Sequence, residues 1–421
     1  MDWLKYDENI WHPFTQHAIE KNRIGITHGK DTLLFDVNGK AYIDAVSSWW
    51  VNIYGHANVK IANAVKQQLD VLEQVIFAGF THEPACVLSE NLLKILPSNF
   101  SKIFFSDNGS TSVEVALKMA VQFWHNQGKK KSKIIAFKNA YHGDTFGAMS
   151  VGKSDFFAAY EDLLFDVIQI DIPTDDNFIS LKASFEKITA GKDVACFIFE
   201  PLIQGSGGMQ MYVANYLDEL IQIARHNEVI CIADEVMTGF GRTGERFAID
   251  YLENKPNIIC LSKGITGGFM PLSVTICEQE IYDAFYTSDK LKTLFHGHSY
   301  TANLLGCAAA NASVQLLEEY YPRIKELSAW QMDFAGELKD LTNVKNIRTL
   351  GTILAFEIES TSSSYFNQVR DFVYQRFLEE GVLLRPLGNT IYVMPPYCIS
   401  YEQLSTIYQK IRKVIGALNS K

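Results

Sequence analysis

The chain has 421 residues, of which 47% are hydrophobic, so it can form a large buried core and two domains. Its formal net charge of −10 at pH 7 argues against binding to nucleic acid or to an anionic membrane, and small molecules are the expected partners. The 7 cysteines show no C-x-x-C spacing, which favours reduced, buried thiols over a disulfide framework.

The N-terminal segment, residues 1–16, reads MDWLKYDENIWHPFTQ and carries acidic residues where a secretory signal has a basic start and an apolar core. No apolar run in the sequence approaches the ~18 residues of a membrane span. We therefore expect a cytosolic protein that does not associate with a membrane.

Short apolar runs alternate with helical patterns from about residue 100, which predicts an α/β fold with a large, mostly parallel sheet. The seven runs are KIFFS (102–106), KIIAF (133–137), FDVIQI (165–170), VACFIFE (194–200), VICIADE (229–235), NIICLSK (257–263) and LSVTIC (272–277). Most are nearly continuous in apolar character, as expected for strands that are covered on both faces. The last connection, residues 264–271, is too short for a parallel crossover, so the seventh strand should run antiparallel.

The pattern changes beyond residue 310 to a smaller α+β arrangement. A long helix is followed by a hairpin-like segment (346–359), another helix, an extended segment (382–396) and a last helix (401–418). We therefore predict a large domain over residues 51–310 and a small domain over residues 311–421, with the N-terminal segment 1–50 packed on the small domain.

The segment after the first strand is a candidate anion site, because ligands of open α/β sheets bind beyond the carboxyl ends of the parallel strands. Gly109 and Ser110 lead into an amphipathic helix, and Thr111 with Glu114 matches a capping box. The unpaired amides of such a turn and the helix dipole suit a phosphate, although a plain N-cap is the commoner outcome for this stretch alone.

Three side chains that can carry chemistry follow the second strand: Tyr141, His142 and Asp144. The ring of Tyr141 is wide enough to cover a planar ligand ring, although packing is the more usual role of a single tyrosine. His142 has no second His or Cys at ligand spacing nearby, so we predict no metal site.

Asp234 and Lys263 end two successive strands. A carboxylate at a buried strand end is costly unless paired, and a protonated ring nitrogen would be the best partner for Asp234. An amine that leaves an apolar strand end has its charged form disfavoured, which makes Lys263 a candidate nucleophile. A helix N-cap and a surface lysine are the alternative interpretations.

The glycines of GFGRTG, residues 239–244, fit the dinucleotide pattern G-x-G-x-x-G. A dinucleotide loop needs its first glycine to follow the strand directly, and it needs an acidic residue at the end of the next strand. Here the strand ends at Asp234 and the next one ends at Lys263, so we interpret the glycines as hinges around a pocket. A nucleotide-binding module remains the alternative of a different class.

Pyridoxal 5′-phosphate requires four groups together: a phosphate-binding turn, an aromatic ring over the cofactor ring, a carboxylate for the pyridinium and an amine that forms an imine. The motifs DNGSTSVEVALKMA, YHGDTFGAMSV, FIFEPLIQGSGGM, IADEVMTGFGRTG and CLSKGITGG resemble those of the class III pyridoxal-phosphate aminotransferases of fold type I, over nearly the whole chain. The resemblance implies an α/β transferase that forms a homodimer with active sites at the interface.

The resemblance also implies roles for single residues. Lys263 is similar to the Schiff-base lysine of the family, Asp234 to the partner of the pyridinium, and Gly109 with Ser110 to the phosphate loop. Tyr141 resembles the tyrosine that stacks on the cofactor ring and also contacts substrate.

In FHGHSY, residues 295–300, Gly297 resembles a substrate contact, and Ser299 resembles a hydroxyl that reaches the phosphate from the partner subunit. His298 stands beside it, where the family commonly has proline, and is included in the predicted cofactor site.

IWHPFTQ, SSWWVNIYGHAN, LFHGHSYTAN and LLRPLGNTIYVMPP resemble one branch of the family, which transfers an amino group to 8-amino-7-oxononanoate in biotin synthesis. The resemblance implies that Phe14 and Trp49 line an apolar substrate channel and that Arg385 binds the acceptor carboxylate. A structural ion pair is the alternative role of Arg385. Another class III enzyme, such as an ω-amino acid aminotransferase, is the alternative activity.

The usual amino donor of that branch is S-adenosylmethionine. Phe14 stands where the branch commonly has tyrosine, which keeps the ring and removes a hydroxyl. S-adenosylmethionine is the predicted donor, and lysine is the alternative.

Overall fold

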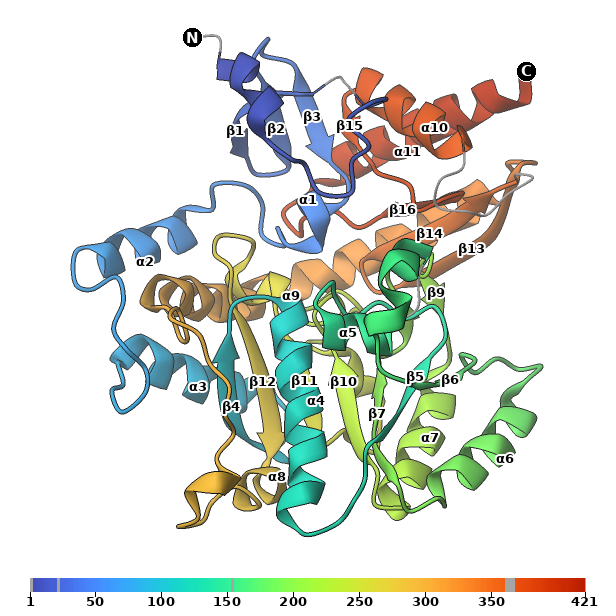
Figure 1. Cartoon of the computed structure of the whole chain (residues 1–421). Coiled ribbons are helices and arrows are strands. Elements are labelled where there is room, and N and C mark those ends of the chain that lie inside the picture. Colours follow the sequence, from blue (N-terminus) through green and yellow to red (C-terminus); the bar gives the residue numbers. More distant parts are fainter. Residues whose placement is uncertain (1–2, 21–22, 153–154, 360–367, 421) are drawn as a thin grey trace.

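A seven-stranded sheet lies at the centre of the larger part of the molecule, in a computed structural model that describes residues 3–20, 23–152, 155–359 and 368–420 (Figure 1). The strand order is β4-β12-β11-β10-β7-β5-β6. The strands are β4 (Phe100–Ser106), β5 (Lys133–Phe137), β6 (Ile168–Ile170), β7 (Val194–Phe199), β10 (Ile230–Asp234), β11 (Ile258–Leu261) and β12 (Ser273–Glu278). Neighbours pair in parallel except at β12, which is antiparallel to both β11 and β4. The predicted seven-stranded sheet and its antiparallel seventh strand are confirmed.

The predicted run at 165–170 is wrong at its start, because only Ile168–Ile170 forms a strand. The backbone N–H of Phe165 donates to the hydroxyl of Ser150, 3.2 Å away, and the Phe165 side chain is exposed. A side-chain acceptor outside the sheet therefore takes the hydrogen bond at this position.

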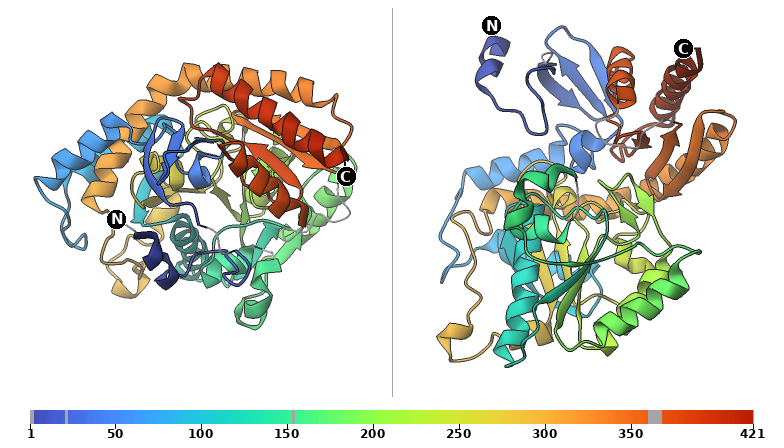
Figure 2. Two further views of the ribbon diagram at one scale, coloured as in Figure 1. Left: turned by 90° about the horizontal axis from the view of Figure 1, so that it is seen from above. Right: turned by 45° about the vertical axis from the view of Figure 1, so that its right-hand side comes forward.

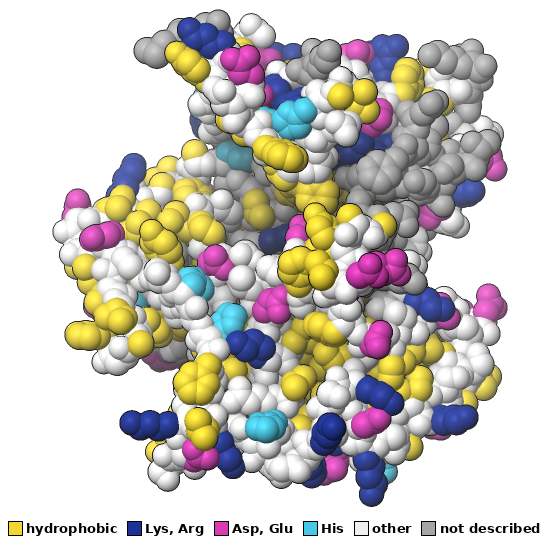
Figure 3. Space-filling model, in the orientation of Figure 1, with side chains coloured by type: hydrophobic (Ala, Val, Ile, Leu, Met, Phe, Trp, Pro, Cys, Tyr) yellow, Lys and Arg dark blue, Asp and Glu magenta, His cyan; other side chains and the backbone are white. Residues whose placement is uncertain are grey.

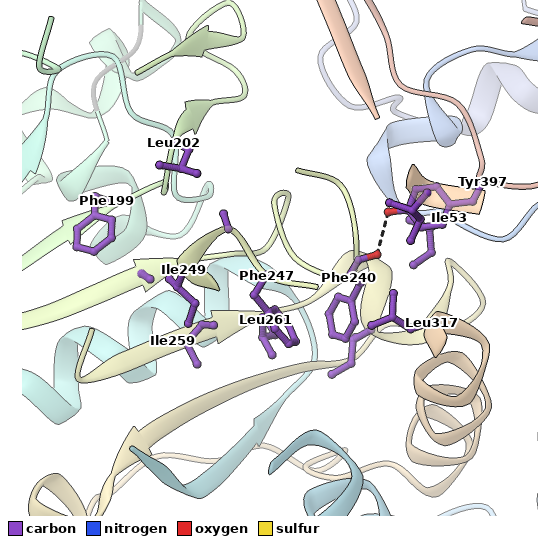
Figure 4. Close-up of a cluster of buried hydrophobic side chains, with 14 of the residues drawn as sticks. Ile53, Phe199, Leu202, Phe240, Phe247, Ile249, Ile259, Leu261, Leu317 and Tyr397 are labelled. Carbon is purple, nitrogen blue, oxygen red and sulfur yellow. Dashed lines mark hydrogen bonds between the residues drawn. The ribbon is translucent and has the colours of Figure 1, made fainter. Parts of the chain in front are cut away.

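Helices cover both faces of the sheet (Figure 1). One face carries α4 (Gly109–Asn126), α5 (Phe146–Val151) and α8 (Gln279–Asp283); the other carries α3 (Glu83–Ile95), α6 (Phe178–Thr189), α7 (Ala214–His226) and α9 (Leu304–Leu338), with α2 (Val59–Leu69) packed on α9. Alternate side chains of β7 pack on the two faces of the sheet. Ile198 lies in the hydrophobic core under α4, and Phe199 lies in the core on the opposite face (Figure 4). A strand that is buried on both faces explains the continuous apolar runs.

Both ends of the chain contribute to the smaller part of the molecule (Figure 2). One of its sheets contains β1 (Ile26–Lys30), β2 (Leu33–Asp36), β3 (Ala41–Asp44) and β15 (Val382–Leu383), and β15 pairs in parallel with β3. A second sheet contains β13 (Val344–Leu350), β14 (Ile353–Ile358) and β16 (Thr390–Val393), and the helices of this part are α10 (Gln368–Glu379) and α11 (Tyr401–Gly416). The domain boundaries at residues 50 and 310 stay predictions.

The remaining elements are short. They are η1 (Trp3–Asn9), α1 (Ser47–Trp50), η2 (Asp155–Leu163), β8 (Ile203–Gln204), β9 (Gln210–Met211), η3 (Ala248–Tyr251), η4 (Lys263–Thr266), η5 (Lys290–Lys292) and η6 (Ala417–Ser420). In the part of the chain that the structure describes, no helix is long and apolar enough to cross a membrane.

The glycines of the GFGRTG segment have neighbours too close to leave room for a side chain. A Cβ at Gly241, where φ is +100°, would lie 2.4 Å from Cδ1 of Ile324 in α9. A Cβ at Gly351, in the turn between β13 and β14, would lie 2.1 Å from the backbone nitrogen of Gly244. The GFGRTG segment therefore packs closely on α9 and on the turn between β13 and β14, and this packing counts against the interpretation as a nucleotide-binding loop.

The adjacent acids Asp234 and Glu235 have different roles. Glu235 is fully buried, and its carboxylate accepts the N–H groups of Ala248 and Ile249, at 2.9 and 2.8 Å, and the hydroxyl of Thr238 at 2.9 Å. It therefore fixes the segment that follows the GFGRTG loop.

Replacing Glu235 by alanine should lower the free energy of unfolding by about 2–4 kcal/mol, because two buried backbone N–H groups lose their acceptor. Denaturant unfolding of the purified variant measures this loss. Glu253→Ala removes an exposed acid nearby and should change the stability by less than about 0.5 kcal/mol. Equal effects of the two substitutions would contradict a structural role of the Glu235 carboxylate.

Candidate active site

A cavity of about 660 Å³ lies at the carboxyl ends of the parallel strands. Predicted site residues that follow four different strands line it, namely Gly109, Ser110, Tyr141, Asp234 and Lys263. Their convergence follows from the parallel topology, because the carboxyl ends of parallel strands meet at one edge of the sheet.

Helix α4 begins at this cavity, and its cap differs from the prediction. The capping residue is Asn108, whose side chain accepts the N–H of Thr111 at 3.1 Å, while the Thr111 hydroxyl accepts the N–H of Asn108 at 3.2 Å. The predicted capping box of Thr111 with Glu114 is therefore wrong. Glu114 instead accepts the hydroxyl of Thr145 at 2.6 Å and the N–H of Gly147 at 2.8 Å.

The start of α4 presents donors that suit an anion. The hydroxyl of Ser110 lies 3.2 Å from that of Thr145, and both residues line the cavity with Gly109. The first backbone N–H groups of this 18-residue helix have no partner within the helix, and the helix dipole adds a partial positive charge at the same end. This end of the cavity can hold a phosphate.

Asp234 is buried and is oriented by two hydrogen bonds. Its Oδ1 accepts the N–H of Val236 at 3.0 Å, and its Oδ2 lies 2.7 Å from Nδ1 of His142, which donates to it. The imidazole has no exposed surface, and its Nε2 has no hydrogen-bond partner among the described residues. His142 is the partner that sequence reasoning missed, although its position directly after Tyr141 gave a signal. No group of three or more His, Cys, Asp or Glu side chains in the described ranges is arranged to hold a metal ion.

Tyr141 is held at both its backbone and its hydroxyl. The hydroxyl donates to Asp144 at 2.9 Å, and the backbone N–H donates to the buried carboxylate of Glu200 at 3.1 Å. Burial and the charge of Asp144 raise the pKa of Tyr141 well above its ordinary value, so the phenol stays protonated. The ring is therefore fixed at the cavity wall.

Glu200, at the end of β7, is a second site residue that sequence reasoning missed. Its carboxylate also accepts the N–H of Gly205 at 2.9 Å, and it lines the cavity with Asp234. Burial raises the pKa of Glu200 to about 7, while the charge of His142 opposes this rise and that of Asp234 adds to it. Only its position in the motif FIFEPLIQGSGGM pointed to this residue.

Lys263 lies two residues after the end of β11 and begins η4, in a left-handed backbone conformation with φ of 47°. Burial lowers the pKa of Lys263 below its ordinary value, although the charges of Asp234 and Glu200 act in the opposite direction. Its Nζ lies 4.8 Å from the centre of the Trp50 ring. The neutral form of the amine is therefore favoured inside the cavity.

A second cavity of about 440 Å³ adjoins the first, because Trp50, Tyr141 and Lys263 line both. Phe14, Trp49 and Arg385, the predicted substrate residues, line this second cavity together with Tyr374, Tyr392, Ser206 and leucines, none of which was predicted. The rings of Phe14 and Trp49 meet edge to face with centres 5.5 Å apart, and the Arg385 guanidinium lies 5.2 Å from the Trp49 ring. An apolar channel with a cation at its wall suits a long acid.

Gly297, His298 and Ser299 line neither cavity of the single chain. They lie before α9, where the side chain of Gln74 donates to the carbonyl of Ser299 at 3.0 Å. The structure does not bring these three residues to the site that the other predicted residues share within one chain.

A seven-stranded sheet with a lysine and a carboxylate at neighbouring strand ends defines an α/β transferase of fold type I. The family model of the class-III aminotransferases matches residues 15–415, so the chain belongs to the class III aminotransferases and is a transaminase.

Similar proteins and solved structures match nearly all of the chain. A Synechococcus elongatus protein named adenosylmethionine-8-amino-7-oxononanoate aminotransferase is 45% identical, over 97% of this chain and 99% of its own. The crystal structure of the Methanocaldococcus jannaschii protein of the same name is 36% identical with a TM-score of 0.90, and covers 97% of this chain and 98% of its own. An amine transaminase from an uncultivated Pseudomonas species, solved in a PLP-bound form, is 26% identical with a TM-score of 0.91, at 97% and 98% coverage.

Proposed function

We propose that the protein transfers an amino group to 8-amino-7-oxononanoate, giving 7,8-diaminononanoate in biotin biosynthesis, with pyridoxal phosphate as cofactor and S-adenosylmethionine as donor. The observation that carries this proposal is the pair of adjoining cavities, one lined by Lys263 and Asp234 and the other lined by Arg385. The names of the most similar relatives support the same reaction.

The residues of the first cavity fit pyridoxal phosphate. Gly109 and Ser110 at the start of α4 would hold the phosphate, and Asp234 would hold a proton on the pyridine nitrogen. Tyr141 would cover the ring, and Lys263 would bind the cofactor covalently. When bound, the cofactor withdraws electrons from the substrate carbon that bears the amino group.

Lys263 moves the proton of the reaction. Because burial lowers its pKa, Nζ of Lys263, when it is not bonded to the cofactor, would have a free lone pair for taking a proton from the substrate carbon, and the ammonium so formed would deliver that proton to the cofactor. Asp234 keeps its orientation throughout, since Val236 and His142 each donate to one of its oxygens. These two hydrogen bonds hold the charged carboxylate in one position at the cavity.

The second cavity would hold the acceptor. Phe14 and Trp49 supply apolar walls for its aliphatic chain, and the planar guanidinium of Arg385 can bind the carboxylate with two parallel hydrogen bonds. The ring of Trp49 lies against the guanidinium and limits the directions in which it can donate.

We also propose a homodimer in which Gly297, His298 and Ser299 of the partner subunit complete the site. Figure 3 shows hydrophobic side chains over α2 and the segment after it, and Val71 and Phe295 are 78% and 68% exposed in the single chain. Exposed apolar side chains of this size favour burial against a second subunit. We also propose that the protein is cytosolic.

The donor is the first test of the proposed function. The Phe14 ring keeps an aromatic wall, and one missing neutral hydrogen bond costs only about 0.5–1.5 kcal/mol, too little to abolish use of a donor held by many contacts. In single turnovers followed by the cofactor spectrum, millimolar S-adenosylmethionine should aminate the cofactor and lysine should not. The aminated enzyme should then convert 8-amino-7-oxononanoate.

Phe14→Tyr serves as the matched variant and should change the affinity for S-adenosylmethionine by no more than about tenfold. Amination by lysine alone would assign the donor role to lysine. Turnover with ω-amino acids and none with 8-amino-7-oxononanoate would replace the proposed reaction with that of another class III enzyme.

A further inference from the structure

The segment Ser47–Trp50, assigned as α1, has an unfavourable backbone. Ser47, Ser48 and Trp50 have φ values of 51°, 62° and 68°, in the left-handed region that residues with a side chain rarely adopt, and Trp49 between them has φ of −138° and ψ of 58°. Such a conformation persists only where the surrounding structure holds it, and strained residues of this kind gather at functional sites.

The strained backbone carries two adjacent indoles of the site: Trp50 lines both cavities, and Trp49 lines the second. The Trp50 ring lies 4.8 Å from Nζ of Lys263, and its Nε1 donates to the hydroxyl of Tyr392 at 3.0 Å. The Trp49 ring faces the other cavity, where the guanidinium of Arg385 lies 5.2 Å from it.

Asp44 holds the first half of this segment. It is the last residue of β3 and is fully buried. Its Oδ1 accepts the N–H groups of Val46 and Ser48 at 3.2 and 2.9 Å, and its Oδ2 accepts the Ser48 hydroxyl at 3.1 Å. The carboxylate therefore replaces the acceptors that a regular backbone would provide at these positions.

His56 connects the two ends of the segment. Its Nε2 donates to Oδ2 of Asp44 at 2.9 Å, and its Nδ1 accepts from the side-chain amide of Asn52, also at 2.9 Å. Asp44 lies before the strained residues and Asn52 after them. The backbone of His56 is itself fixed by a bridge to Asp31, with hydrogen bonds of 2.6 and 3.1 Å.

Asp44 and His56 line neither cavity, so neither can touch substrate or cofactor there. We propose that Asp44 and His56 are positioning residues that hold Trp49 and Trp50 against the substrate, and thereby set the affinity for the acceptor. The part of this inference that concerns the acceptor rests on the proposed function, whereas the part that concerns the two indoles does not.

The kinetic test uses Asp44→Asn, His56→Ala and His56→Gln in the full-length enzyme loaded with cofactor. The KM for 8-amino-7-oxononanoate should rise about tenfold or more in the first two variants, while the rate of amination by the donor changes less than about twofold. His56→Gln keeps a donor toward Asp44 and should recover part of the loss. Asp7→Asn is the matched control, because it breaks a surface His–Asp contact of 3.0 Å with His12.

A structural test needs no substrate and therefore separates this inference from the proposed function. The chain contains 6 tryptophans, and labelling with 5-fluorotryptophan gives each a ¹⁹F resonance, which Trp49→Phe and Trp50→Phe assign. Asp44→Asn and His56→Ala should shift or broaden these two resonances and leave the other four unchanged. Unchanged Trp49 and Trp50 resonances, or equal losses in the donor and acceptor half-reactions of a folded variant, would overturn the inference.

Discussion

Replacing Lys263 by alanine should reduce the rate of amino transfer by about 10⁴-fold or more, because the substitution removes both the covalent attachment of the cofactor and the group that moves the proton. The buried position and lowered pKa of Lys263 support both roles. Borohydride treatment of the wild-type enzyme followed by peptide mapping should put the pyridoxyl label on Lys263, and Lys263→Ala should carry no label.

Lys131 is the matched control for this experiment. Burial also lowers its pKa, but its Nζ donates to the carbonyl of Glu228 and lies 3.8 Å from the Trp124 ring, and neither cavity contains it. Lys131→Ala should keep the label on Lys263 and nearly the full activity. A label on Lys131 in the wild-type enzyme would show that a lowered pKa alone selects the lysine, and would end the assignment of Lys263.

Replacing Arg385 by alanine should weaken binding of 8-amino-7-oxononanoate by roughly 2–5 kcal/mol, as expected when a charged ligand group loses its partner. The Nε of Arg385 is buried and has no hydrogen-bond partner among the described residues, and Arg385 lines the cavity that would hold the acceptor. The donor half-reaction should stay nearly unchanged, and rapid measurement of the two half-reactions separates these effects.

Arg385→Lys tests the geometry of the same contact. A lysine keeps the charge but loses the planar fork and much of the contact with Trp49, so it should recover only part of the affinity. If Arg385→Ala slows both half-reactions equally, the arginine has the structural role that the sequence left open.

The sequence predicted the sheet because its signal is local. The continuous apolar run at 194–200 identifies a strand that is buried on both faces, and β7 is buried along its whole length. The short connection at 264–271 fixed the antiparallel direction of β12, since chain length alone excludes a parallel crossover. The position of Asp234 and Lys263 at two strand ends then follows from the topology.

Only the tertiary structure decided which side chains meet. The contact of His142 with Asp234 joins residues 92 positions apart, and Phe14 reaches Trp49 from a segment with no regular strand or long helix. Local patterns carry no information on such distant pairs, so no role for His142 could be predicted from them. The alternatives for Asp234 and Lys263 stayed open in the sequence for the same reason.

The cap of α4 shows the same limit within one turn of helix. The local pattern predicted a capping box of Thr111 with Glu114, whereas the structure uses Asn108 with Thr111. The decision comes from the loop at residues 145–148, whose backbone N–H groups and hydroxyl take the Glu114 carboxylate. By itself the sequence determined the seven strands of the large sheet, apart from the start of β6, and their order along the chain, because these depend on local periodicity and chain length. The partners of buried polar groups depend on which distant donors the folded chain brings within hydrogen-bond distance, and the tertiary structure alone decides that.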